Sequence, residues 1–156
     1  MLVRKAILDD ADLACEVLRL SIIELCGSDH RNQRQTLEAW LNNKTPENVR
    51  EWFSDPRRYC VVADVNSRIV GVGSITSHGE IGLLYVAPTA RFQGVSKQML
   101  ASLEYWAQSH GLASVFLLST GTARQFYESL GYQPSGEPSK CFGEALGYPM
   151  QKLVAA

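Results

Sequence analysis

The sequence predicts a single domain of the α/β class, in which a mixed sheet is covered by helices on both faces. Three observations lead to this prediction. The chain has 156 residues, which suits one domain. Two β-rich runs, 59–65 and 69–76, are separated only by a tight turn at 66–68. In the second half, strand and helix patterns alternate, which is typical of a layered α/β fold.

The first half of the chain is predicted to form one strand and three helices. The strand covers 2–8, and the helices cover 9–26, 36–41 and 45–53. Asp9 or Asp10 can cap the first helix, whereas Thr45 is the N-cap of the third and Pro46 its first helical residue. The first helix is predicted from apolar residues at helical spacing, namely Leu13, Val17, Leu20 and Ile23 or Glu24.

The second half is predicted to form five strands and two helices. The strands cover 59–65, 69–76, 80–88, 113–118 and 148–154, and the helices cover 96–110 and 122–132. Pro88 stops the third of these strands, and Gly111 and Gly131 end the helices. Residues 134–147, rich in proline and glycine, are predicted to be the loosest part. The longer helix places on one face Met99, Leu100, Leu103 and Trp106.

Charge and composition exclude some classes of protein. The net charge is −1 and the isoelectric point is near 6.3, whereas a nucleic-acid binder usually carries a basic surplus. No apolar run approaches the length of a membrane span, and residues 1–10 lack the apolar core of a signal peptide. We therefore expect no nucleic-acid partner, no membrane association and a cytoplasmic location.

The four cysteines form no CxxC pair, which argues against a zinc site or a redox motif. No metal is expected, and the thiols are predicted to be buried in a reducing compartment. These cysteines are Cys15, Cys26, Cys60 and Cys141.

Residues 90–100, ARFQGVSKQML, place basic side chains and a glycine where a helix begins. A helix N-terminus exposes unpaired N–H groups and carries a partial positive charge. Gly94 allows close backbone approach, and Arg91 and Lys97 add charge, so the stretch suits a pyrophosphate. The alternative is an ordinary helix start with a loop glycine, because an RxxGxS pattern alone is a weak signal.

Two linked motifs resemble those of the GNAT family of N-acetyltransferases. The first, Q/R-x-x-G-x-G/A after a strand ending in V-x-P, is present as RFQGVS at 91–96 after VAP at 86–88. The second, A-x-x-F/L-Y-E-x-x-G-F/Y, is present at 123–132. The resemblance is most specific over 80–132. It implies the GNAT fold, with a mixed, mostly antiparallel sheet of about six to seven strands, as a single domain over 1–156.

The resemblance implies acetyl-CoA as the acetyl donor. Its pyrophosphate would lie on the backbone from Phe92 to Lys97, and its pantetheine arm would pair with the strand 80–88 like an added strand. Ser96 stands where glycine or alanine is usual, and Thr120 where many members have an asparagine that contacts pantetheine. The residues assigned to acetyl-CoA in this way are Leu84, Tyr85, Val86, Arg91, Phe92, Gln93, Gly94, Val95, Ser96, Lys97, Thr120 and Arg124.

Acetyl transfer to an amine needs a base and an acid. An amine of pKa about 10.4 is mostly charged at neutral pH, and its deprotonation costs about 4 to 5 kcal/mol without help. Glu80 matches a position where some family members carry a base, acting directly or through water; the alternative is a solvent-facing glutamate at a strand entrance. Tyr127, inside the second motif, is the predicted acid, and core packing is its alternative.

A group of polar residues near the end of the first long helix is assigned to the acceptor side by the same resemblance. His30 beside Asp29 is an alternative base, and a polar cluster at a helix C-terminus is an equally simple interpretation. The acceptor is expected to be a small-molecule or peptide amine, and a homodimer is a reasonable default for such an enzyme. The assigned residues are Ser21, Glu24, Asp29 and His30.

A second function from a different class remains open at this stage. The chain could be a non-catalytic module that binds or senses acyl-CoA. Glu80 and Tyr127 favour the enzyme, whereas the missing asparagine at Thr120 weakly favours the binding module. An acceptor borne on RNA is disfavoured by the net charge of −1.

Overall fold

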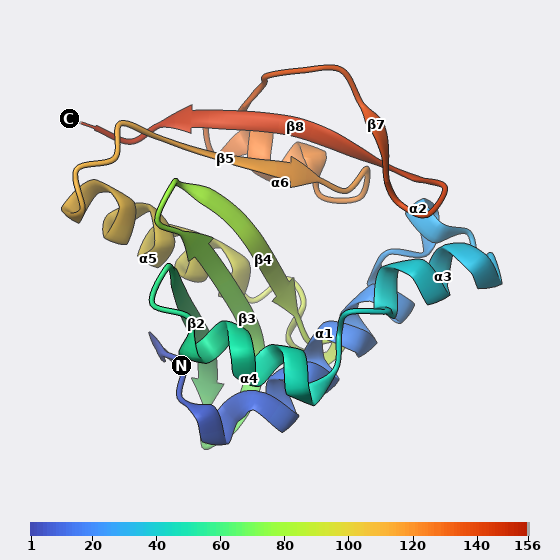
Figure 1. Cartoon of the computed structure of the whole chain (residues 1–156), viewed down its shortest axis with the longest axis horizontal. Coiled ribbons are helices and arrows are strands. Elements are labelled where there is room, and N and C mark those ends of the chain that lie inside the picture. Colours follow the sequence, from blue (N-terminus) through green and yellow to red (C-terminus); the bar gives the residue numbers. More distant parts are fainter. Residues whose placement is uncertain (156) are drawn as a thin grey trace.

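A computed structural model describes residues 1–155 of the chain. Its centre is a sheet in the strand order β1-β2-β3-β4-β5-β8-β6, with β7 added to β8 (Figure 1). Every strand pair is antiparallel except β4 and β5, which are parallel. The strands are β1 Leu2–Lys5, β2 Arg58–Val65, β3 Arg68–Thr76, β4 Glu80–Val86, β5 Ser114–Ser119, β6 Gln133–Pro134, β7 Ser139–Phe142 and β8 Ala145–Leu153.

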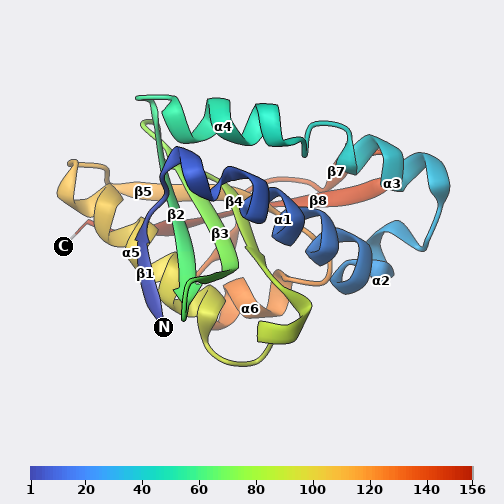
Figure 2. The same cartoon turned by 90° about the horizontal axis from the view of Figure 1, so that it is seen from below.

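Helices lie on both faces of the half-sheet β1–β4. Helices α1 and α4 cover one face and α5 covers the other (Figure 2). Helix α6 packs into the same core as α5, together with the inner faces of β5 and β8. The predicted α/β class with a mixed, mostly antiparallel sheet is thus confirmed. The helices are α1 Ala11–Leu25, α2 Gly27–His30, α3 Arg34–Leu41, α4 Pro46–Ser54, α5 Val95–Ser109 and α6 Arg124–Ser129.

The pleat of β2 sends neighbouring side chains to different faces of the sheet. Val61 and Ala63 join α5 in the largest core cluster, whereas Cys60 and Val62 pack on the side of α4. All four side chains are buried. Because burial of one valine contributes about 1.5–3 kcal/mol, a one-residue slip of β2 would be strongly unfavourable.

The predicted hairpin and the predicted helix cap are both present. Asn66 and Ser67 have φ of 52° and 66°, as the two central residues of a type I′ turn require. Thr45 accepts a hydrogen bond from the backbone N–H of Asn48 at 3.2 Å, and Pro46 follows it as the first residue of α4. Both features were predictable because their signals are local.

Three local expectations are wrong. Strand β1 ends at Lys5 because the chain enters a short 3-10 turn at Leu8–Asp10. The segment predicted to be loose contains β6, β7 and the start of β8. It is ordered by tertiary packing, since the ring of Phe142 stacks on Trp40 with centroids 4.6 Å apart. Among the cysteines predicted to be buried, Cys141 on this hairpin is exposed.

Helix α1 is present as predicted, but it turns a different face to the sheet. Of the predicted apolar stripe only Val17 is buried, whereas Leu13, Leu20 and Ile23 are 48%, 47% and 40% exposed. The buried face is rotated from the predicted stripe, and it combines small side chains with Val17, Leu18 and Ile22. The small buried residues of α1 are Ala11, Ala14, Cys15 and Ser21.

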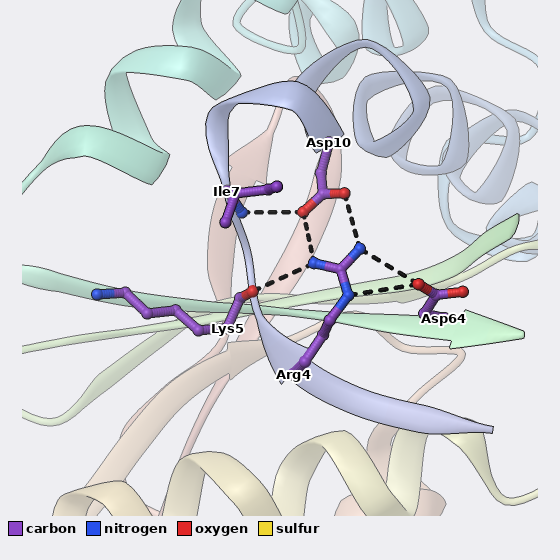
Figure 3. A network of polar contacts seen from close by, with 5 residues as sticks. All are labelled: Arg4, Lys5, Ile7, Asp10 and Asp64. Carbon is purple, nitrogen blue, oxygen red and sulfur yellow. Dashed lines mark hydrogen bonds and ion pairs between the residues drawn. The ribbon is translucent and has the colours of Figure 1, made fainter. Parts of the chain in front are cut away.

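An ion-pair network ties β1 to β2 and to the start of α1 (Figure 3). Arg4 donates two hydrogen bonds to Asp10, at 2.8 and 2.9 Å, and two longer ones to Asp64, both at 3.3 Å. Asp10 also accepts from the backbone N–H of Ile7 at 2.9 Å, so it caps the 3-10 turn that leads into α1. The hydrogen bonds from Arg4 hold the pKa of the Asp10 carboxyl below its ordinary value.

Replacing Asp10 with asparagine should lower the free energy of unfolding by about 1–3 kcal/mol at neutral pH, because Arg4 loses its charged partner. Since the folded-state pKa of Asp10 is lowered, its contribution is fully present above the ordinary carboxyl pKa of about 3.9 and is lost as pH falls through the lower folded-state value. Urea unfolding of both proteins from neutral to acidic pH measures the difference.

The control for this measurement is Asp12→Asn. Asp12 is an exposed carboxylate on α1 that pairs with Arg50 at the surface, at 3.1 Å, and such pairs contribute about 0–1 kcal/mol. This variant should therefore differ little from the unmodified protein. A difference for Asp10→Asn that stays constant down to the most acidic pH would contradict the assignment.

Candidate active site

Strands β4 and β5 separate soon after they begin. They are paired at only two positions, Glu80 with Phe116 and Ile81 with Leu117, although β4 continues to Val86. Figure 1 shows the two strands diverging from this point. Beyond Ile81, no strand in residues 1–155 pairs with the edge of β4 that faces β5. Its backbone N–H and C=O groups are therefore available to another extended molecule.

A bulge in β4 accompanies this gap. Ser74 and Ile75 are neighbours on β3, but they pair with Leu83 and Ile81, so Gly82 is the extra residue of β4. A bulge bends its strand and increases the local twist. The bend directs the rest of β4 away from β5 while its pairing with β3 continues.

Helix α5 begins shortly after the free edge of β4 ends. Gly94 precedes the helix with φ of 77°, and no heavy atom lies within 4 Å of the place where its Cβ would be. The N–H groups of the first helical turn have no intrahelical partners. Phe92 also has a left-handed φ, of 64°, and such turns direct successive N–H groups into anion-binding concavities. Val95 is buried in the main core, which fixes the start of the helix.

The side chains around this helix start are mostly exposed. Arg91 and Lys97 are exposed cations, and the Arg91 guanidinium lies 4.6 Å from the centre of the Phe92 ring. Gln93 is exposed and donates to the Thr89 carbonyl at 3.3 Å. The charge, the unpaired N–H groups and the open space above Gly94 together suit a doubly charged anion.

Tyr127 on α6 has a buried ring and an accessible hydroxyl. Its side chain is 7% exposed and packs edge-on against Phe126 and Tyr132. In residues 1–155, every enclosed side-chain nitrogen or oxygen has a hydrogen-bond partner. The Tyr127 hydroxyl has none in that part of the chain, so it borders open space. Burial, and secondly the nearby Tyr85 phenol, raise the pKa of Tyr127, which keeps its proton at neutral pH.

Tyr85 on β4 brings a second phenol close to Tyr127. Burial raises its pKa, and a hydrogen bond from the indole N–H of Trp40, at 3.4 Å, opposes that shift. From the sequence, Tyr85 was expected only as a backbone partner of pantetheine. The alternation of β4 gave no sign of its hydroxyl contact, because Trp40 lies 45 residues earlier in the chain.

Glu80 lies at the closed end of the gap, where β4 and β5 are still paired. Its backbone N–H donates to Thr76 Oγ1 at 3.1 Å, and its side chain is exposed to water. Phe116 is the strand partner of Glu80, and Gly121 contacts Asp29 at the end of β5. These two residues are five positions apart, which is about 16 Å at 3.3 Å per residue. The structure therefore does not gather Glu80 and the predicted acceptor-side residues into one cluster.

His30 is fully buried, and backbone groups use both of its ring nitrogens. Its Nε2–H donates to the carbonyls of Ile22 and Ile23, at 2.9 and 3.2 Å. Its Nδ1 accepts from the backbone N–H of Asn32 at 3.0 Å. Neither ring nitrogen is therefore free, and this geometry suits a structural role better than that of a base.

Asp29, Thr120 and Arg124 meet where β5 ends. Asp29 on α2 accepts a hydrogen bond from the backbone N–H of Gly121 at 2.6 Å. The Thr120 hydroxyl accepts from the backbone N–H of Ala123 at 3.1 Å, in the turn that precedes α6. The Arg124 guanidinium lies 4.2 Å from the centre of the Tyr148 ring on β8.

A cavity of about 330 Å³ opens beside Asp29, between α2 and the β7–β8 hairpin. Its volume is within the range of small-molecule sites. Of the predicted acceptor-side residues, only Asp29 lines it; Ser21 is buried on α1, and Glu24 is exposed on the same helix. The lining includes Ser28, Asp29, Arg31, Glu144, Leu146 and Tyr148.

The described part of the chain, residues 1–155, contains neither a cluster of metal ligands nor a membrane-spanning helix. Within residues 1–155, no three His, Cys, Asp or Glu side chains gather as metal ligands do. No helix in the same residues has the length and apolar character of a membrane span.

Comparison with known proteins places this geometry in a family. Residues 28–154, most of the chain, match the family model described as an acetyltransferase (GNAT) domain. Among curated protein sequences there is no significant match.

Solved N-acetyltransferases share the fold at low sequence identity. A GCN5-related N-acetyltransferase from Rhodopseudomonas palustris aligns with a TM-score of 0.86 at 21% identity, over 97% of this chain and 94% of its own. The PaiA N-acetyltransferase from Thermoplasma acidophilum, solved with coenzyme A, gives 0.82 at 18% identity over 97% and 98%. An aminoglycoside 6'-N-acetyltransferase from Enterococcus faecium gives 0.73 at 19% identity over 100% and 98%.

Proposed function

This chain belongs to the GNAT family of acetyltransferases, and we propose that it transfers an acetyl group from acetyl-CoA to a primary amine of a small molecule or peptide. One observation carries the proposal. The unpaired edge of β4 begins beside Glu80 and ends near the open N-terminus of α5. Tyr127 packs in the same core cluster as Leu84 and Val86 of that strand. An anion site, a free strand edge, a carboxylate and a phenol therefore line one gap.

The residues along this gap fit acetyl-CoA. The two amides of pantetheine suit the free backbone groups of residues 84–86, as an added strand would. A pyrophosphate suits the first N–H groups of α5, where Gly94 leaves open space and Arg91 and Lys97 supply positive charge. Bound acetyl-CoA would supply the thioester. Further proposed contacts are the backbone of Phe92 and Val95 and the side chains of Gln93, Ser96, Thr120 and Arg124.

Glu80 is the proposed base. An acceptor ammonium must lose a proton before its nitrogen can attack the thioester carbonyl, and this costs about 4–5 kcal/mol at neutral pH for an amine of pKa near 10.4. Glu80 is exposed at the closed end of the gap, and it takes this proton through water. The attack forms the C–N bond, and the C–S bond then breaks.

Tyr127 is the proposed acid. Its raised pKa keeps the hydroxyl protonated, and within residues 1–155 no other group holds that hydroxyl. It is therefore free to give its proton to the departing thiolate. After the attack, the nitrogen loses its second proton through water, which returns a proton to Tyr127, and Glu80 releases its proton to bulk water. Both residues are thereby restored for the next turnover.

We place the acceptor in the cavity between α2 and the β7–β8 hairpin. The cavity meets the donor gap at the end of β5, where Asp29 contacts Gly121. Tyr85 of β4 packs against the core cluster that contains Ala145, and Ala145 also lines the cavity. An amine held there can approach the thioester from the side of α2.

A screen of amines, polyamines, amino acids and peptides with acetyl-CoA, measured by thiol release, tests this function. Sustained turnover with at least one amine is expected. A non-catalytic module would bind acetyl-CoA in calorimetry but release no thiol with any acceptor. Mass spectrometry of the product decides whether the acetyl group is on nitrogen.

Replacing Gly94 with glutamate should weaken coenzyme A binding by about 100-fold or more, because it places a carboxylate against the pyrophosphate. Calorimetry with the folded variant measures the loss. Gly111→Glu is the matched control, because Gly111 has the same φ of 77° and equally open surroundings at the other end of α5. Both variants carry the same backbone strain, and only Gly94→Glu should lose affinity. Equal affinities of the two variants for coenzyme A would show that the pyrophosphate does not bind at this helix start.

The variant Glu80→Gln should lower kcat/KM by roughly 10²- to 10⁴-fold, and most strongly at low pH, where the acceptor amine is charged. Coenzyme A affinity should change little. A pH profile of kcat/KM measures the effect, with Glu51→Gln, an exposed glutamate on α4, as the control. A slight loss at every pH would show that Glu80 is a surface residue.

The variant Tyr127→Phe should lower kcat by about 10²-fold or more while the acceptor KM and the melting temperature stay nearly unchanged. Stability is preserved because the hydroxyl has no partner within residues 1–155. Tyr132→Phe is the control: its hydroxyl donates to Glu104 at 2.7 Å, so its loss should cost about 1–2 kcal/mol of stability and spare kcat. Normal kcat in Tyr127→Phe would rule out the acid role, and a raised KM for acetyl-CoA alone would mean that the hydroxyl only binds the sulfur.

A further inference from the structure

Asp29 joins the acceptor side of the molecule to the loop that precedes α6. Its carboxylate accepts hydrogen bonds from the backbone N–H of Gly121 at 2.6 Å, from the backbone N–H of Thr122 at 3.3 Å and from the Thr122 hydroxyl. The partners lie 92 and 93 positions away in the sequence. Hydrogen bonds to a charged acceptor are roughly twice as strong as neutral ones, so this contact restrains the loop.

The contact requires an unusually close approach of the two segments. A Cβ on Gly121 would lie only 2.8 Å from Oδ1 of Asp29, so a side chain there would push the carboxylate away. Asp29 itself stands on a fixed support, because the next residue, His30, is fully buried and bonded to backbone at both nitrogens. The missing side chain at Gly121 and the fixed ring of His30 thus both favour the contact between Asp29 and the loop.

A continuous set of hydrogen bonds leads from this loop to Tyr127. The Thr120 hydroxyl accepts from the backbone N–H of Ala123 at 3.1 Å. The Ala123 carbonyl in turn accepts from the backbone N–H of Tyr127, also at 3.1 Å. The loop that Asp29 holds therefore sets the start of α6 and, one turn later, the position of the Tyr127 backbone.

We propose that Asp29 is a positioning residue: it holds the loop at Gly121 and Thr122 so that α6 presents the Tyr127 hydroxyl to the departing sulfur. This inference rests on the acid role proposed for Tyr127. Because the carboxylate oxygens are already engaged with the loop, Asp29 contributes little to acceptor affinity, although it lines the cavity. Loss of Asp29 therefore acts on the rate of the chemical step.

Steady-state kinetics of Asp29→Ala, with the best amine of the screen, gives the first test. We expect kcat to fall by about 10- to 100-fold, the effect of a misplacement of about 1 Å at a reacting group. The KM values of both substrates should stay nearly constant. Thr122→Val keeps the size of the side chain and the charge of Asp29 but removes the hydroxyl donor, and it should show a smaller loss of the same kind. Asp12→Asn is the control for removal of an exposed helix carboxylate.

A double-mutant cycle with Tyr127→Phe separates positioning from a general structural effect. If Asp29 acts through the Tyr127 hydroxyl, Asp29→Ala should lower kcat far less in the Tyr127→Phe background than in the unmodified protein. Equal losses in the two backgrounds would overturn the proposal. The cycle is repeated with Thr122→Val, which keeps the test decisive if Asp29→Ala does not fold.

The remaining outcomes distinguish this inference from the proposed function. A raised acceptor KM with normal kcat in Asp29→Ala would make Asp29 a binding residue and overturn the positioning role. A reduced kcat in Tyr127→Phe with normal kcat in Asp29→Ala would overturn positioning alone and leave the acid role standing. Normal kcat in Tyr127→Phe would overturn the acid role and, with it, the inference drawn here.

Discussion

The loss of pairing between β4 and β5 is the constraint on which the rest of the site depends. Two residue pairs join these strands, and the bulge at Gly82 then bends β4 away. Free backbone groups usually occur at the border of a sheet, where another chain can pair with them. Here the free edge lies in the middle of the strand order, opposite β5. Only narrow, extended molecules can therefore reach it. A pantetheine arm has that shape and carries amides that can satisfy the edge.

The elements around the gap are held relative to one another by contacts that are separate from the reacting groups. Val95 and Met99 anchor α5 in the main core, and Tyr132 joins the same core just after α6. The Tyr132 hydroxyl donates to Glu104 on α5 at 2.7 Å, and Lys152 on β8 donates to the same carboxylate at 3.1 Å. This network fixes α5 and the end of α6 together. The proposed anion site at the start of α5 and the Tyr127 phenol therefore keep a constant relation.

The elements that frame the proposed donor site could be predicted from the sequence because their signals are local. Pro88 and Gly94 mark the end of β4 and the start of α5, and the apolar spacing of α5 has the correct face, with Met99, Leu100 and Leu103 buried. The acceptor side depends on contacts between distant segments. The stack of Phe142 on Trp40 orders the β7–β8 hairpin, and no local pattern indicates it.

Two further features of the structure were not indicated by the residue pattern. His30 was considered as a base from its type and its position beside Asp29, but the helix break at Cys26 returns the chain so that the ring meets the carbonyls of Ile22 and Ile23. The buried face of α1 was predicted from the stripe of Leu13, Val17, Leu20 and Ile23, whereas the packed face contains Leu18 and Ile22 together with small residues.

The wall of the proposed acceptor cavity rests on its own cluster, around Ile22, Cys26, Trp40 and Ala145, apart from the core that anchors Tyr127. Substitutions at well-separated sites have nearly additive effects, so the lining of the cavity can change without displacing the donor site. The two sides remain in contact at two residues. Tyr85 of β4 packs against this cluster and accepts a hydrogen bond from Trp40, and Asp29 accepts one from the backbone of Gly121.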